Sequence, residues 1–341
     1  MFMVFKRGGM YNNAHATICR NISVTLMLQL ISEQKMHRIR PGKLLNFPNW
    51  LAILLVFALL PTRGHAQNTN QTVNPPSNVP TGSRRPVNEP ANPALPSLFL
   101  IGDSTVRNGQ GNGADAQWGW GDLLAPYFDT SKINVVNRAL GGTSSRTFYR
   151  DQWARVLARL KPGDFVIMQF GHNDGGAIND TNRARGTIKG VGDETQEIDN
   201  LITKKHEVVH SFGWYEKQII LEARTKGAMP VVCSLIPRNN WKEGAVIRNK
   251  NDYAGWAGQV ARSENAPFLD INEIIARLYD QLGQEKVKPL FIVGAGPHTS
   301  RAGAETNAAC VVSALKGLEE NLLQKFFSEK AGSVKPADLK P

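Results

Sequence analysis

Four short polar motifs contain the residue types that acyl transfer requires. Ser104 lies in Gly-Asp-Ser-Thr, Gly142 ends Asn-Arg-Ala-Leu-Gly-Gly, Asn173 lies in Gly-His-Asn-Asp, and His298 begins His-Thr-Ser. A serine hydroxyl is a weak nucleophile that needs a base within hydrogen-bond reach, and His298 is the best candidate. The backbone N–H groups of Ser104 and Gly142 and the Asn173 amide could stabilise an oxyanion. These residue types predict the site of a serine hydrolase.

The elements that must position these motifs alternate between short apolar runs and longer helical patterns. Strands are predicted at 97–101, 133–137, 164–170, 230–235 and 267–271. Helical patterns lie near 120–128, 147–160, 213–226, 251–264, 271–282 and 302–325. Such alternation is typical of an α/β fold whose parallel sheet is covered on both faces. The first three motifs directly follow the first three strands, at the sheet edge where such folds bind ligands.

The sequence resembles the SGNH (GDSL) hydrolases, and within them the rhamnogalacturonan acetylesterase-like group. The resemblance rests on the motifs at 102–105, 137–142, 171–176 and 298–305, together with Trp-Gly-Trp-Gly at 118–121. It implies a flavodoxin-like three-layer α/β/α sandwich with a five-stranded parallel sheet over residues 96–325. It also implies a carbohydrate esterase that removes O-acetyl groups from pectic polysaccharide.

The resemblance gives each motif a role. It makes Ser104 the nucleophile, Gly142 and Asn173 oxyanion donors, and His298 the base. Esterases acting on other acetylated glycans or on small esters remain alternatives within the same chemistry.

The sequence departs from this family at one catalytic position. The family places an aspartate three residues before the catalytic histidine, and this chain has Ala295 there. Loss of the orienting acid costs roughly 10⁴-fold in rate where it has been removed. His298 is therefore oriented by a backbone carbonyl or water, or by a carboxylate from elsewhere in the chain. Otherwise the protein is a catalytically weakened relative that binds glycans.

The positive charge of the chain is concentrated near its N-terminus. The 341 residues carry a formal net charge of +11, and residues 1–66 contribute eight Lys or Arg against one acidic residue. Residues 36–66 have a basic start, a 10-residue apolar run at 51–60 and small residues before Gln67, the pattern of a cleaved signal peptide. The run is too short to span a bilayer, so no stable membrane insertion is expected after cleavage. Residues 1–35 are an unassigned extension.

This distribution of charge bears on localisation and partners. The signal predicts a secreted or periplasmic protein. The remaining 275 residues carry only +4, which removes the argument for a nucleic-acid partner. The expected partner is an acetylated polysaccharide substrate, and the sequence does not indicate an oligomeric state.

Outside the predicted domain, composition favours loose segments. Residues 67–95 are rich in Asn, Pro, Ser and Thr and are predicted to be a disordered linker, and 326–341 a flexible tail. Cys233 and Cys310 remain after signal cleavage and could either pair or stay as two buried thiols. A long polar segment at 175–212 interrupts the α/β alternation and is expected to be functional or disordered.

Four residues are candidates for contact with the substrate. Trp241 is a candidate sugar-stacking wall, and His172 a candidate substrate-side residue. Arg183 and Arg185 could attract the carboxylates of an acidic sugar polymer. No metal or organic cofactor is expected, because the histidine pair at 206 and 210 has no third ligand nearby.

Overall fold

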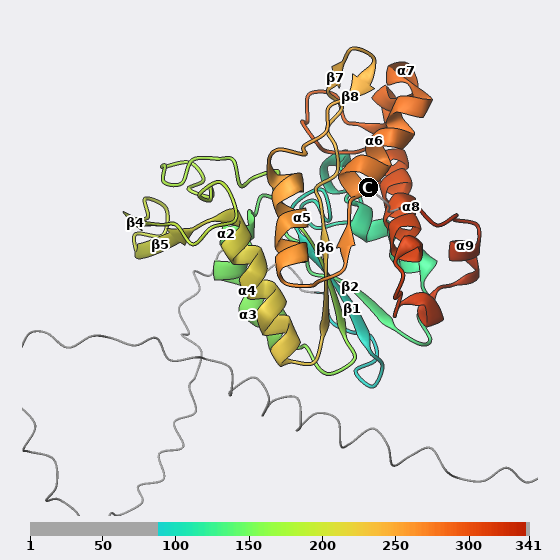
Figure 1. Ribbon diagram of the computed structural model, residues 1–341, viewed down its shortest axis with the longest axis horizontal. Helices are drawn as coiled ribbons and strands as arrows, with labels where there is room; N and C mark the ends of the chain where they lie inside the picture. The colour runs from blue at the N-terminus through green and yellow to red at the C-terminus, as the bar shows by residue number, and fades with distance from the viewer. Residues whose placement is uncertain (1–87, 339–341) are drawn as a thin grey trace, which may run out of the picture. The chain divides into compact units, whose positions relative to one another are not determined.

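Short apolar segments form a five-stranded parallel sheet in the order β2-β1-β3-β6-β9 (Figure 1). The computed structural model describes residues 88–338, so the predicted signal peptide, the extension before it and residues 67–87 lie outside the described residues. The strands are β1 (Ser97–Gly102), β2 (Asn134–Asn137), β3 (Phe165–Gln169), β6 (Met229–Cys233) and β9 (Phe268–Leu269). All five lie within the predicted runs or extend them by one residue. The α/β prediction with a five-stranded parallel sheet is confirmed.

Helices cover both faces of the sheet and make three layers (Figure 1). One face packs against α2 (Ser145–Phe148), a π-helical turn (Tyr149–Trp153), α3 (Ala154–Leu157), α4 (Phe212–Thr225) and α5 (Tyr253–Ser263). The other packs against α6 (Ile271–Leu282) and α8 (Arg301–Gly317), with α7 (Gln284–Val287) following α6. β1 is buried along its whole length because both faces of the sheet are covered.

Side-chain caps fix where three of the long helices begin. The Ser211 hydroxyl accepts a hydrogen bond from the Trp214 N–H at the start of α4, at 3.1 Å. Asp270 caps α6 and Ser300 caps α8 in the same way. The cap residue Ser300 lies two residues after His298, so helix initiation helps to set the position of the candidate base.

Residues predicted to form a helix at 120–128 instead form two 3₁₀ turns, Trp120–Leu123 and Ala125–Tyr127. Glycine and proline explain the difference. Gly121 lies so close to the preceding loop that a Cβ would be 2.8 Å from the Val106 carbonyl oxygen, and Pro126 cannot donate a helical hydrogen bond. The helical pattern expected at 302–325 likewise ends at Gly317, and a 3₁₀ turn follows at Gln324–Phe326.

Segments at both ends of the predicted domain, residues 88–95 and 326–338, make specific contacts with it. Arg138 forms an ion pair with Glu89 at 3.3 Å, and the Asn92 N–H donates to Asn134 Oδ1 at 2.9 Å. At the other end, Phe327 packs on Phe128 with ring centroids 5.3 Å apart. A short helix, α9 (Glu329–Gly332), follows. Specific polar and aromatic contacts hold segments whose composition is typical of linkers.

The polar segment at 175–212 is folded rather than disordered. It contains an antiparallel hairpin of β4 (Thr195–Asp199) and β5 (His206–His210) that projects beside α2 and α4 (Figure 1). A second small hairpin, β7 (Trp241–Lys242) with β8 (Ala245–Val246), follows β6. Both hairpins are absent from the sequence-based prediction. The strands of the first are mostly polar, and those of the second have only two residues each.

Two further observations bear on the sequence analysis. Cys233 and Cys310 are both buried free thiols, which decides between the two readings of the cysteine pair. Over residues 88–338, none of the helices has the length and apolar character needed to cross a membrane.

Candidate active site

The candidate nucleophile lies in a tight turn directly after β1. Asp103 Oδ1 accepts hydrogen bonds from both the N–H and the hydroxyl of Thr105, each at 2.8 Å, and this bracket folds the chain around Ser104. Gly102 is required here, because a Cβ would lie 2.5 Å from the Gln169 carbonyl oxygen. Ser104 has an exposed fraction of only 7%, so the turn encloses most of the residue.

His298 is within hydrogen-bond distance of that hydroxyl. Its Nε2 lies 2.8 Å from Ser104 Oγ, although 194 residues separate them in the sequence. The next residue anchors the histidine loop: Thr299 Oγ1 donates to the Trp118 carbonyl at 2.8 Å, and the Trp118 N–H donates to the Thr299 carbonyl at 3.0 Å. Trp118 belongs to the Trp-Gly motif, which therefore positions the base.

The other ring nitrogen of His298 has no carboxylate partner. Nδ1 is inaccessible to solvent and makes no hydrogen bond within the described part of the chain. The carbonyl oxygen of Ala295 raises the pKa of His298, but its geometry falls short of a hydrogen bond to Nδ1. Burial has the larger effect and lowers the pKa of His298, and the positive charge of Arg238 lowers it further. The imidazole is therefore neutral at neutral pH, as a general base must be.

The two candidate oxyanion donors lie on loops that follow β2 and β3. Gly142 has φ = +83°, a conformation that favours glycine. Its neighbour Gly141 lies against the nucleophile, since a Cβ there would be 3.5 Å from the Ser104 Cβ. Asn173 Nδ2 donates to the Thr143 carbonyl at 2.8 Å, which orients the amide and leaves its second N–H for a ligand.

A buried carboxyl joins these two loops. Asp174 accepts hydrogen bonds from the N–H and hydroxyl of Ser145, at 3.0 and 2.5 Å, and from the Gly171 N–H at 3.1 Å. Complete burial raises the pKa of Asp174 to about 7. This side chain fixes the loop after β3, and with it Asn173, to the start of α2.

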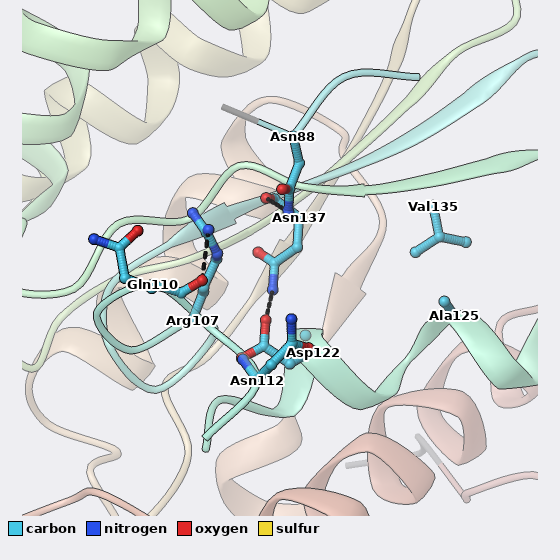
Figure 2. A pocket seen from close by; sticks show the side chains of 9 residues that line it. Asn88, Arg107, Gln110, Asn112, Asp122, Ala125, Val135 and Asn137 are labelled. Atoms are coloured by element: carbon cyan, nitrogen blue, oxygen red, sulfur yellow. Dashed lines mark hydrogen bonds between the residues drawn. The ribbon is translucent and has the colours of Figure 1, made fainter. Parts of the chain in front are cut away.

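On the far side of the nucleophile turn, the asparagine of the Asn-Arg-Ala-Leu-Gly-Gly motif has a structural role (Figure 2). Asn137 Nδ2 donates to Asp122 Oδ1 at 3.0 Å and to the Val106 carbonyl at 3.1 Å. Asn137 and Asp122 line a small polar cavity of about 150 Å³, which Arg107 also lines. The contacts tie the end of β2 to the turn that holds Ser104.

The structure places two of the four predicted substrate residues beside the oxyanion donors. Arg185 Nη1 donates to the Gly142 carbonyl at 2.7 Å. The Nη1 atoms of Arg183 and Arg185 each lie 3.7 Å from the position of a Cβ on Gly142. Asp180 Oδ1 shapes this loop by accepting backbone N–H bonds, including one from Arg183 at 2.6 Å. Both arginines therefore lie beside the candidate oxyanion donor Gly142, and their contact with substrate carboxylates stays a prediction.

The other two predicted substrate residues are placed differently. His172 is near His298, but both of its ring nitrogens are buried without a hydrogen-bond partner, and burial lowers the pKa of His172 to about 3. Trp241 packs partly against the hydrophobic core, and its Nε1 donates to Asn239 Oδ1 at 2.7 Å. Neither contact brings Trp241 to Ser104.

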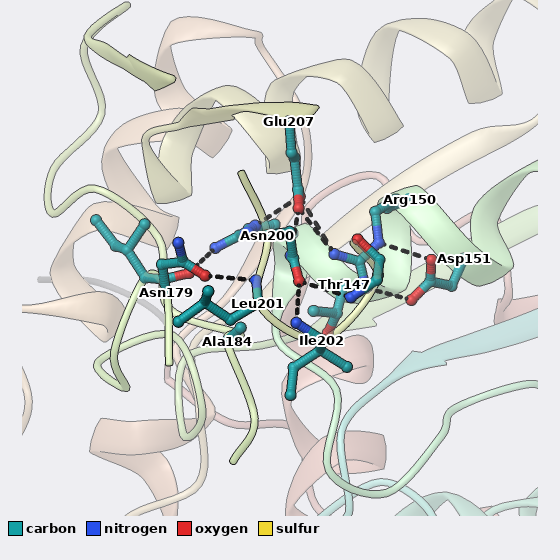
Figure 3. Close-up of polar contacts among 12 residues, drawn as sticks. Thr147, Arg150, Asp151, Asn179, Ala184, Asn200, Leu201, Ile202 and Glu207 are labelled. Carbon is teal, nitrogen blue, oxygen red and sulfur yellow. Dashed lines mark hydrogen bonds and ion pairs between the residues drawn. The ribbon is translucent and has the colours of Figure 1, made fainter. Parts of the chain in front are cut away.

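An ion-pair network that the sequence analysis missed anchors the loop that carries Arg183 and Arg185 (Figure 3). Glu207 on β5 accepts from Arg146 Nε at 2.8 Å, from Arg150 Nη1 at 3.1 Å and from Asn200 Nδ2 at 2.6 Å. Arg146 is fully buried, and its Nη1 also donates to the Gly186 carbonyl at 2.8 Å. No sequence signal distinguishes Arg146 or Glu207 from surface charges, because their pairing depends on the unpredicted hairpin.

Comparisons with known proteins agree with this geometry. Residues 100–305 match the GDSL-like Lipase/Acylhydrolase family. The chain is 30% identical over 220 residues to a rhamnogalacturonan acetylesterase of Emericella nidulans, which covers 64% of this chain and 84% of that protein. It is 29% identical over 238 residues to the probable rhamnogalacturonan acetylesterase YesY of Bacillus subtilis, covering 68% of this chain and 98% of the relative.

A solved structure, protein YXIM_BACsu from Bacillus subtilis, superposes with a TM-score of 0.52 at 25% identity, over 65% of this chain and 56% of that one. The family match spans the nucleophile turn, both oxyanion loops and the histidine loop. This chain therefore belongs to the GDSL-like lipase/acylhydrolase family and is an ester-bond hydrolase with the three-layer α/β fold of the SGNH enzymes.

Proposed function

We propose that this protein is an exported esterase that removes O-acetyl groups from an acidic, pectic polysaccharide. The observation that carries the proposal is the 2.8 Å contact between Ser104 Oγ and His298 Nε2, with Gly142 and Asn173 on the adjoining loops. Export rests on the signal-like residues 36–66. The choice of substrate rests on the rhamnogalacturonan acetylesterase relatives and on the arginines beside Gly142.

The acylation step follows from the arrangement of these groups. Ser104 Oγ attacks the acetyl carbonyl carbon while its proton passes to His298 Nε2. The N–H groups of Ser104 and Gly142 and the free N–H of Asn173 donate to the oxyanion of the tetrahedral intermediate. When the intermediate collapses, the carbon–oxygen bond to the sugar breaks, and the sugar oxygen takes the proton from Nε2. The products of this half-reaction are the free sugar hydroxyl and an acetyl ester on Ser104.

Deacylation uses the same groups in the same roles. A water molecule loses a proton to His298 Nε2 and attacks the acetyl-serine carbonyl. The second tetrahedral intermediate releases acetate, and Ser104 regains its proton from Nε2. Because burial and Arg238 lower the pKa of His298, the unprotonated imidazole that the cycle needs persists to lower pH than in an ordinary histidine.

Acetate release from acetylated rhamnogalacturonan tests the proposal. The wild type should release acetate, and Ser104→Ala should lose nearly all of this activity while retaining the wild-type fold. Acetylated xylan, which is neutral or weakly acidic, serves as the matched substrate and should be the poorer one. Equal acetate release by wild type and Ser104→Ala would refute the role of Ser104.

Ala295 favours a second candidate, a glycan-binding relative with little turnover. Here the site would bind acetylated glycan while His298, lacking a carboxylate partner at Nδ1, would activate Ser104 poorly. Binding of the polysaccharide by the wild type without acetate release, and without labelling of Ser104 by a fluorophosphonate, would favour this candidate over the esterase.

A further inference from the structure

Arg238 is an unpaired cation at the edge of the site. It lies five residues after the end of β6, in a loop at the carboxyl edge of the sheet, and its side chain is half-buried. Its Nη1 is 3.5 Å from the position of a Cβ on Gly296, in the loop that leads to His298. Within residues 88–338 its guanidinium makes neither a hydrogen bond nor an ion pair. Guanidinium groups with so little exposure are normally paired.

The groups around Arg238 do not neutralise it. The positive charge of Arg238 lowers the pKa of Asp103, but the Asp103 side chain is fully buried. One of its carboxylate oxygens accepts hydrogen bonds from Thr105, and the other has no hydrogen-bond partner. The remaining groups that face it are His172 and His298, and the positive charge of Arg238 lowers the pKa of both. The position at which the family carries an aspartate, Ala295, adds no negative charge.

These positive charges disfavour the proton transfer from Ser104 to His298. When Ser104 attacks, His298 becomes an imidazolium, and the resulting cation forms beside the Arg238 guanidinium. Two like charges that interact in a partly buried site disfavour each other, and Arg238 already lowers the pKa of His298. A carboxylate in direct contact with Arg238 would offset that penalty. Within residues 88–338 the carboxyl group that interacts with Arg238 electrostatically, Asp103, makes no ion pair or hydrogen bond with it.

We propose that Arg238 binds a uronate carboxylate of the polysaccharide, and that this substrate carboxylate supplies the negative charge missing at position 295. The inference rests on the proposed function and names the substrate group that the site recognises. A guanidinium presents parallel N–H donors that match the two oxygens of a carboxylate. In an acidic polysaccharide, a uronate on a neighbouring sugar is covalently tied to the acetylated one and arrives with it.

Arg238 suits this role better than the two arginines beside the oxyanion donors. Arg185 already uses Nη1 on the Gly142 carbonyl, and Arg183 is exposed. Both lie next to Gly142, whereas Arg238 lies next to the loop of the base. A carboxylate at Arg238 therefore acts on the protonation of His298, so it should raise kcat as well as lower KM.

The test uses two acetylated rhamnogalacturonan oligosaccharides of equal length, one with free uronates and one with the same uronates methyl-esterified. The wild type should show kcat/KM at least tenfold higher for the free acid, with part of the difference in kcat. Arg238→Gln should reduce this ratio to about 2 or less. Arg277→Gln, which removes an exposed cation on α6, is the charge-matched control and should keep the wild-type ratio.

The outcomes separate this inference from the proposed function. If the wild type hydrolyses neither oligosaccharide, the proposed function fails and the inference fails with it. If it hydrolyses both equally well, the inference is overturned while the esterase stands. An unchanged ratio in Arg238→Gln also overturns it.

Arg238→Lys keeps the positive charge but cannot form the bidentate contact with a carboxylate. It should give an intermediate ratio of kcat/KM between the free acid and the methyl ester. Inhibition of the wild type by the two deacetylated oligosaccharides needs no variant. The free acid should inhibit at a concentration at least tenfold lower than its methyl ester, and equal inhibition would contradict the proposal.

Discussion

Replacing Ala295 by aspartate tests directly how His298 works without a carboxylate partner. The substitution restores an acid three residues before the histidine, where Nδ1 is buried and makes no hydrogen bond. A carboxylate there should orient the ring and stabilise the imidazolium that forms when Ser104 attacks. Two effects are expected: a higher pKa for His298 and a higher kcat.

The size of the first effect follows from the charges involved. In the wild type, burial and Arg238 hold the pKa of His298 below its usual value of 6.5. An opposite charge about 4–6 Å away raises a histidine pKa by about 1–3 pH units. Unprotonated His298 is the active form, so activity falls as the pH drops through its pKa. The acidic limb of the kcat/KM profile should therefore move to higher pH by about 1–3 units in Ala295→Asp.

The assay is the pH dependence of kcat/KM for a small neutral acetate ester, which avoids any charge on the substrate. Ala295→Asn is the matched control, since asparagine has nearly the same size as aspartate and carries no charge. Without a charge only a small change in the solvation of His298 remains. The acidic limb of Ala295→Asn should therefore stay within about 0.5 pH units of the wild type. The plateau rate of Ala295→Asp should rise at least tenfold, a small part of the roughly 10⁴-fold attributed to such acids. An acidic limb that stays in place or moves to lower pH would refute the reasoning and show that the loop holds position 295 away from Nδ1.

Two further predictions concern the framework of the site. Glu207→Ala leaves the fully buried Arg146 without its carboxylate partner and should lower the free energy of unfolding by about 3–5 kcal/mol, measured by urea denaturation. Glu197→Ala, on the exposed face of the neighbouring strand, is the control and should change it by less than about 0.5 kcal/mol. Asn173→Ala removes one oxyanion donor and should lower kcat by about 10²–10³-fold with little change in KM. A higher KM with an unchanged kcat would instead make Asn173 a substrate-binding residue.

The sheet and the core of the site could be predicted because their signals are local. Short apolar runs mark strands such as 97–101, and the motif after each strand must lie at the carboxyl edge of a parallel sheet. That rule alone brings Ser104, Gly142 and Asn173 together. The contact with His298 required the resemblance to a family, because 194 residues separate the two side chains and no local pattern links them.

The rest depended on contacts that sequence patterns do not encode. The β4–β5 hairpin has polar, mostly exposed strands, so it lacks the apolar alternation that identifies strands. Arg146 became recognisable only when the hairpin brought Glu207 to it. Arg238 stands out only in three dimensions, because its distinguishing property is the lack of a partner among residues 88–338. Composition also gives no sign of the contacts that residues 88–95 make with the domain, such as those of Glu89 and Asn92.

The central claim is that Ser104 forms the acyl-enzyme with His298 as its base. The most direct measurement is mass-spectrometric mapping of the residue that a fluorophosphonate modifies in the wild type, in Ser104→Ala and in His298→Ala. We predict a single adduct on Ser104, none in Ser104→Ala, and labelling slowed by at least 10²-fold in His298→Ala. An adduct on another residue, or labelling of His298→Ala at the wild-type rate, would contradict the account.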